Sequence, residues 1–125
     1  MNSQQISAEY GALKKRIEAE IQVTTKNDTV AAYRFLEKID TLINLQYCAT
    51  NYRILLESTE DEESRGLVRK HLHIFMTTVY LDYLDEVIDA ANSWKADSSG
   101  MVSLQRQVRD RLVPVREFLE SEFGD

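Results

Sequence analysis

The sequence has few of the residues that interrupt helices or crosslink chains. Its 125 residues include one Pro, four Gly and one Cys. β-Sandwiches and α/β domains need frequent turns, which Gly and Pro usually supply, so this shortage favours long helices. The single Cys48 excludes a disulfide within the chain and is typical of a reducing compartment.

The sequence also lacks the signals of membrane insertion and export. No stretch approaches about 18 consecutive apolar residues, so no membrane-spanning helix is predicted. The first ten residues, MNSQQISAEY, have neither the basic nor the apolar segment of a secretory signal. These observations predict a cytoplasmic protein that does not enter membranes.

Positive charge is in deficit. The chain has 15 Lys and Arg against 21 Asp and Glu, a net charge of −6 with a pI near 4.9. This balance disfavours general binding to nucleic acid or anionic membranes and leaves room for a basic protein partner. The length predicts one domain, residues 1–125, with a core of its own.

Helical periodicity is what the sequence has in abundance. Apolar residues recur every three or four positions in four segments, residues 4–23, 29–57, 60–95 and 101–123. In the third segment the apolar stripe covers about half of the helix circumference, more than one neighbouring helix needs. The short loops between segments favour antiparallel neighbours. The sequence therefore predicts an all-α, antiparallel up-down four-helix bundle with a long central third helix.

The third helix, if continuous, is roughly 50 Å long at about 1.5 Å per residue. It is longer than the first and fourth, so its overhang must bend, break or pack on another copy. Its middle, LHIFMTTVYL (residues 72–81), is uncharged and resembles a strand when taken alone, but the helical spacing on both sides predicts a helix. Pro114 predicts a kink in the fourth helix, and the sequence leaves open whether the helix ends there.

Capping residues mark two helix starts. Asn27 or Asp28 can accept hydrogen bonds from the first N–H groups of the second helix. Thr59 and Glu62 have the spacing of a capping box at the start of the third.

The two histidines do not form a metal motif. A carboxylate-bridged metal bundle needs Glu-x-x-His pairs, but Val68 and Lys70 stand three residues before His71 and His73. We therefore predict no metal and no cofactor. We expect His71 to border the core and His73 to face a groove or solvent. Cys48 is interpreted as a small buried hydrophobic residue.

One short segment resembles a ribonuclease motif. Residues Arg65 to His71 have the R-x5-H spacing of the HEPN domains, a family of helical-bundle ribonucleases. The resemblance covers seven residues and two identities, and Gly66 stands where that family usually has a polar residue. It implies that Arg65 and His71 would activate an RNA 2′-hydroxyl and stabilise the phosphate at a dimer interface, without a metal.

Asp82, Asp85 and Asp89 form an acidic ridge on the predicted third helix. Basic residues lie near one face of the fourth helix, and an antiparallel turn near Ser98 would place position 85 opposite position 111. These charges can pair across the hairpin, each exposed pair contributing about 0–1 kcal/mol. Alternatively, the ridge recognises a partner, with Tyr80 and Trp94 as aromatic contacts.

The wide apolar stripe of the third helix has two interpretations. It can be the core of a monomer covered by three neighbouring helices. It can also be an oligomer seam, in which part of the stripe packs on a second chain and the protein is a homo-oligomer. The residues of that seam would be Tyr80, Leu84, Ile88 and Ala91.

These patterns favour a small non-enzymatic helical protein that binds another protein, such as an inhibitor, an immunity or antitoxin-type protein, or a chaperone or adaptor. The first alternative is a metal-independent RNA-cleaving bundle that uses Arg65 and His71. The second is a bundle that binds an apolar ligand between its helices, lined by Phe75, Met76 and Val79.

Overall fold

A computed structural model describes residues 1–24 and 26–124, without the side chains of Lys26 and Asn27. Every regular element in this part of the chain is helical. In chain order the elements are α1 (Ser3–Val23), α2 (Lys26–Ser58), α3 (Glu62–Phe75), the π-helical segment η1 (Met76–Tyr80), α4 (Leu81–Ser93) and α5 (Ser99–Phe123). Since α3, η1 and α4 follow one another without a break, they form one long third helix. The predicted all-α class and the four helices are confirmed.

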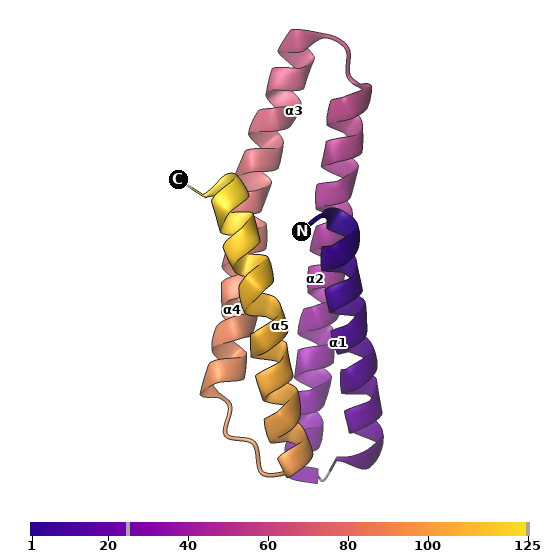
Figure 1. Cartoon of the computed structure of the whole chain (residues 1–125), viewed down its shortest axis with the longest axis vertical. Coiled ribbons are helices and arrows are strands. Elements are labelled where there is room, and N and C mark those ends of the chain that lie inside the picture. The colour runs from indigo at the N-terminus through magenta and orange to yellow at the C-terminus, as the bar shows by residue number, and fades with distance from the viewer. Residues whose placement is uncertain (25, 125) are drawn as a thin grey trace.

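The helices lie side by side along the long axis of the molecule, and consecutive helices run in opposite directions (Figure 1). α1 contacts α2 and α5, while α5 also contacts α4. α2 and α3 project beyond the ends of α1 and α5, so both termini lie partway along the molecule (Figure 1). We call the projecting part, residues 50–71, the hairpin.

The core lies in the part of the molecule where four helices meet. The largest fully buried side chains are Tyr10, Leu13, Ile17, Ile39, Leu42, Met76, Tyr80, Leu84, Met101, Leu104, Leu112 and Leu119. Each contributes roughly 1.5–3 kcal/mol relative to an exposed position. In contrast, no residue of the hairpin is buried. The hairpin therefore has no core of its own, because α1 and α5 reach only its base, near Arg53.

The third helix widens at η1. The backbone N–H of Leu81 donates to the carbonyl of Met76, five residues earlier, instead of four as in an α-helix. Thr78 adds a donor here, because its hydroxyl binds the carbonyl of Ile74 at 2.6 Å. The uncharged segment that resembled a strand is thus helical, but part of it is π-helix.

The start of α3 differs from its prediction. Asp61, not Thr59, is the capping residue, and its carboxylate accepts the N–H of Ser64 at 2.9 Å. The Thr59 hydroxyl instead donates to the carbonyl of Leu55, at 2.7 Å. The predicted capping box of Thr59 and Glu62 is therefore wrong.

Asp28 joins α2 to the loop between α4 and α5. Its buried carboxylate accepts the backbone N–H groups of Asp97 and Ser98, at 3.2 and 2.8 Å. These described bonds run to the loop, so Asp28 does not have the predicted role of capping α2. The same prediction for Asn27 lies outside the described residues. Burial alone would raise the pKa of Asp28, but the hydrogen bonds from Ser98 and Asp97 outweigh it and hold that pKa below its usual range.

α5 continues through Pro114, so that residue does not end the helix. The kink there stays a prediction. None of the described helices is long and apolar enough to cross a membrane.

Candidate functional site

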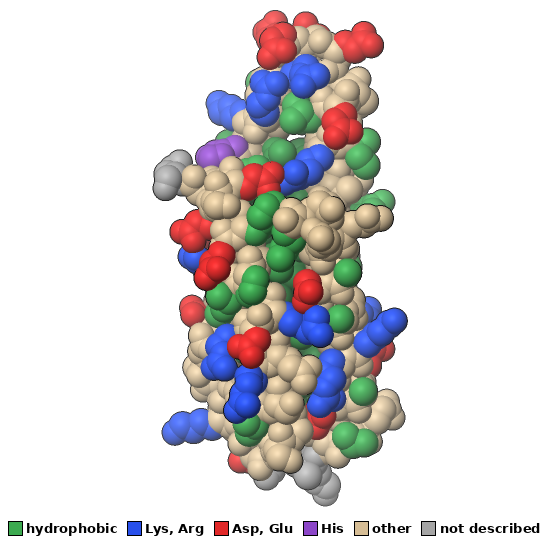
Figure 2. Space-filling model, viewed as in Figure 1, with side chains coloured by type: hydrophobic (Ala, Val, Ile, Leu, Met, Phe, Trp, Pro, Cys, Tyr) green, Lys and Arg blue, Asp and Glu red, His purple; other side chains and the backbone are tan. Residues whose placement is uncertain are grey.

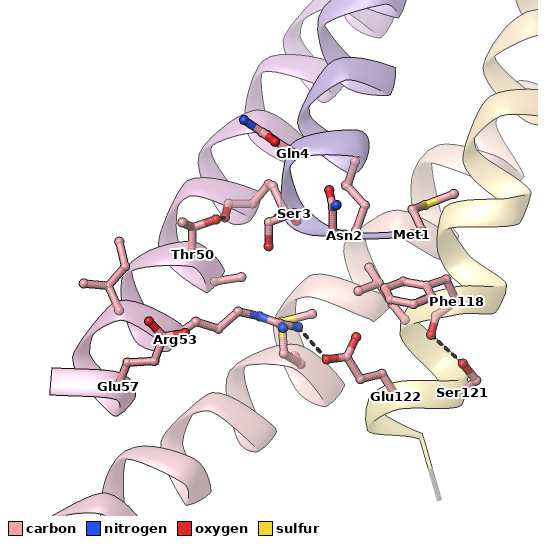
Figure 3. A pocket seen from close by; sticks show the side chains of 16 residues that line it. Met1, Asn2, Ser3, Gln4, Thr50, Arg53, Glu57, Phe118, Ser121 and Glu122 are labelled. Atoms are coloured by element: carbon pink, nitrogen blue, oxygen red, sulfur yellow. Dashed lines mark hydrogen bonds and ion pairs between the residues drawn. The ribbon is translucent and has the colours of Figure 1, made fainter. Parts of the chain in front are cut away.

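The molecule changes from four helices to two where α1 and α5 end. A groove of about 740 Å³ opens at this level, lined by the first residues of α1, the second half of α2, Met76 and the end of α5 (Figure 3). Its volume lies within the range of about 300–1,000 Å³ that is typical of ligand sites. The groove is therefore one candidate for the functional site.

Arg53 and Glu122 close one side of this groove. The Arg53 guanidinium, on α2, lies 2.7 Å from the carboxylate of Glu122, on α5 (Figure 3). The same guanidinium stands over the ring of Phe123, 5.5 Å from its centroid. None of the described residues that line the groove is His or Cys. The arrangement can therefore hold polar groups, but it does not place a cysteine or histidine nucleophile in the groove.

A chain of buried polar side chains leads from the core to the groove. Tyr80 donates its hydroxyl hydrogen to the amide oxygen of Gln46 at 2.6 Å, and its hydroxyl lies 2.8 Å from that of Tyr10. Since Tyr80 uses its own hydrogen on Gln46, Tyr10 is the donor of the second bond. Burial raises the pKa of both tyrosines above the usual value, so both stay neutral.

An exposed uncharged stripe on α2 is the second candidate. Tyr47, Ile54 and Leu55 are 68%, 57% and 50% exposed, which is high for large apolar side chains. Cys48 and Asn51 complete the stripe, because positions 47, 48, 51, 54 and 55 share one side of a helix. No charged residue occurs in α2 between Asp40 and Arg53. We call this surface the α2 stripe.

The α2 stripe corrects the prediction for Cys48. The thiol is exposed instead of buried, and a shallow depression of about 260 Å³ runs past Cys48, Asn51, Tyr52 and Leu55. His71 is also exposed instead of bordering the core, whereas His73 is exposed as predicted. Neighbours such as Ala49 and Leu72 are buried, so these three residues are exposed because they lie on the outer sides of α2 and α3.

The acidic ridge is divided by an ion pair. Asp85 is bound by Arg116 of α5, with a second contact at 3.4 Å, so the predicted pairing between the third and fourth helices exists for this residue. The register differs, because position 85 meets 116 instead of 111. Asp82 and Asp89 are exposed and have no ion-pair partner among the described residues.

The predicted aromatic contacts lie in different environments. Tyr80 has no exposed surface, so it cannot touch a partner while the bundle is folded. Trp94 is partly exposed at the end of α4, and its indole N–H is buried without a partner among the described residues. The other residues of the predicted oligomer seam are buried as well. Leu84, Ile88 and Ala91 are buried in the core, which excludes a second chain from this face.

The residues of the two alternative functions are not brought together. Arg65 is held near its own turn, 3.4 Å from the carbonyl of Thr59 and 4.0 Å from Glu62. His71 is exposed, and six residues of α-helix turn it by about 120° away from Arg65. The apolar-ligand residues also separate, because Met76 lines the groove whereas Val79 is 45% exposed and outside it.

Comparison of the chain with family models, curated proteins and solved structures found no match. The described residues also contain no cluster of three or more His, Cys, Asp or Glu that could hold a metal ion.

Sequence reasoning missed the groove and the α2 stripe. The groove depends on where α1 and α5 end relative to α2, which no local pattern reports. The stripe had a signal, because a charge-free run with apolar residues on two sides of one helix is more than one core face needs.

Proposed function

We propose that this chain is an antiparallel four-helix bundle that acts by binding another protein and has no catalytic activity of its own. The observation that carries the proposal is the α2 stripe, on which three large apolar side chains are at least half exposed. Contiguous exposed apolar surface on a folded domain usually marks an interaction site. The protein would work in a reducing cytoplasm, where the exposed Cys48 remains a thiol.

The chemistry of the stripe indicates what the partner presents. The stripe is helical, mostly apolar and free of charge, and it extends along α2 for about two turns. An amphipathic helix of the partner can lay its apolar side chains along such a surface, as in other helix-in-groove complexes. Asp82 and Asp89 remain a second proposed contact, one that would attract basic side chains of the same partner.

The test is a pull-down from the lysate of the source cell with the full chain, in which protein and nucleic acid are both identified. Leu55→Glu places a charge in the exposed stripe, and we expect it to weaken capture of a stoichiometric protein partner at least tenfold. The fold should be unaffected because Leu55 is half exposed. The matched variant is Asp82→Lys with Asp89→Lys, which alters the ridge only.

Three other results would change the conclusion. Loss of the partner in the ridge variant alone would move the site to the ridge. Equal capture by all variants would remove both surfaces from the proposal. Recovery of RNA without a protein partner would contradict it and make Arg65 and His71 the first residues to mutate.

A further inference from the structure

On the outer side of α3, an acidic and a basic residue lie at equal distances on either side of a central pair of uncharged residues. Going along the helix, Glu63 comes three residues before Gly66, and Lys70 comes three residues after Leu67. All four residues are exposed. They share one side of the helix with Ile74, because positions 63, 66, 67, 70 and 74 follow helical spacing.

Both charges of this pattern are exposed to solvent. Glu63 and Lys70 have no ion-pair partner among the described residues, whereas the neighbouring Glu62 and Arg69 lie 3.5 Å apart and already pair with each other. In Figure 2, acidic side chains gather at the tip of the hairpin and basic side chains lie immediately below them. A surface with separated opposite charges is complementary to an inverted copy of itself.

Apolar side chains and a glycine lie between the two charges. Leu67 and Ile74 are 56% and 45% exposed, on a side of α3 opposite to the buried Leu72 and Met76. A Cβ added at Gly66 would meet nothing within 4 Å, so the fold of the single chain does not require glycine there. Glycine in an exposed helix interior is unfavourable by roughly 0.5–1 kcal/mol relative to Ala. Close approach of another backbone would explain its presence.

We propose that α3 is the contact surface of a two-fold symmetric dimer of this chain. The axis passes between Gly66 and Leu67, and the two α3 helices run antiparallel. Leu67 of each copy then lies over Gly66 of the other, as a knob over a hole. Glu63 of each copy lies opposite Lys70 of the other, which gives two equivalent ion pairs, as an isologous interface requires.

This dimer adds a second surface to the proposed function and does not depend on it. The α2 stripe lies on α2, and the dimer contact lies on the side of α3 that carries Gly66. Failure of partner capture in Leu55→Glu would therefore leave the dimer intact, and failure of the dimer would leave partner capture intact. The two proposals can be refuted separately.

The experiment is sedimentation equilibrium of the full chain over a range of concentrations. We expect a reversible dimer. Glu63→Lys and Lys70→Glu each replace two attractive pairs by two repulsive ones, and each should weaken the dimer roughly tenfold or more. An equimolar mixture of the two variants restores complementary charges, so it should form a heterodimer at a concentration at which each variant alone is mostly monomeric. The double variant Glu63→Lys with Lys70→Glu should also dimerise.

Gly66→Leu supplies an independent test of the close contact. It removes an unfavourable helical glycine, so the melting temperature of the monomer should rise, while the dimer should be lost because the two backbones can no longer approach. A wild-type chain that stays monomeric at all concentrations would overturn the proposal. So would a dimer that neither charge variant weakens, or a mixture of the two variants that stays monomeric.

Discussion

At the residue scale, the buried polar side chains form a chain of hydrogen bonds in which each donor points towards the groove. Tyr10 donates to Tyr80, and Tyr80 donates to Gln46, which lines the groove. A buried hydroxyl without a partner costs about 1–3 kcal/mol, so each member depends on the next. Tyr80 takes part in both bonds, whereas Tyr10 takes part in one.

This difference predicts unequal effects of two similar substitutions. Tyr80→Phe leaves both Tyr10 and Gln46 without their partner and should lower the free energy of unfolding by about 1–3 kcal/mol. Tyr10→Phe removes one bond but keeps that between Tyr80 and Gln46, so its effect should be smaller. Urea unfolding followed by circular dichroism measures both. A Tyr10→Phe variant less stable than Tyr80→Phe would contradict the central place of Tyr80 in this hydrogen-bond network.

The Asp28 carboxylate should make stability depend on acid. Because its pKa in the folded chain is below the usual value, its contribution is present above about pH 4, the pKa of an unfolded Asp, and is lost as the pH falls through the folded pKa. Asp28→Asn should lower the free energy of unfolding at neutral pH by about 1–2 kcal/mol.

The control for Asp28 is the pH profile itself. Measured between about pH 2 and pH 7, the stability difference between the natural chain and Asp28→Asn should shrink towards low pH, where the natural carboxyl is also protonated. A difference that stays constant with pH would mean that the charge of Asp28 does not contribute.

Single residues were the least predictable part of the chain. Cys48 has the size and polarity of a core residue, and its sequence neighbours are apolar, so nothing local shows that it is exposed. Tyr80 was expected at a partner surface, but it is buried. Its hydroxyl bonds to that of Tyr10 on α1, a contact that the sequence does not reveal. In both cases the packing of helices distant in the sequence decided the outcome.

At the element scale, the π-helical segment compensates for the difference between the four-residue spacing of the buried residues and the 3.6-residue period of an α-helix. The buried residues Leu72, Met76, Tyr80 and Leu84 are each four positions apart. On an α-helix each such step drifts by about 40°, so the last residue would have turned about 120° from the first. The wider turn of η1 absorbs this drift and keeps all four side chains on the core.

A deletion can test this account. Removing Thr78, an exposed residue of η1, shortens the step between Met76 and Tyr80 to three positions, which suits a regular α-helix. We therefore expect a folded chain with cooperative thermal unfolding. Removing Glu86, which is also exposed but lies in regular α-helix between buried residues, should turn Val87, Ile88 and Ala91 out of phase with Leu84 and weaken or abolish folding. Equal tolerance of both deletions would refute the role of η1.

The four helices themselves were predictable, because their apolar spacing persists over many turns and the polar breaks between them are short. η1 was not predicted, although the repeated steps of four were visible in the sequence. Local propensity pointed elsewhere, since β-branched and aromatic residues in this segment suggested a strand. The tertiary requirement that one face stay on the core decided the outcome.

At the scale of the whole molecule, the lengths of the helices matter more than their sequences. The sequence predicted that a long third helix would overhang its neighbours, and the hairpin is that overhang. The same reasoning could not give the register of α4 against α5, where Asp85 meets Arg116, since the turn centre was inferred from a loop of several residues. The candidate surfaces follow from this geometry, because the helices leave them uncovered.

The two ends of the molecule are built differently, and this has a consequence for its motions. At one end the Asp28 carboxylate holds the start of α2 to the loop between α4 and α5, a contact that we call the Asp28 clamp. At the other end no residue of the hairpin is buried. Local opening needs least free energy where burial is least. Backbone amides should thus exchange with solvent fastest near the tip and progressively more slowly towards the clamp. A molecule that binds the hairpin should slow this local opening, so its binding can be measured as slower amide exchange in the hairpin.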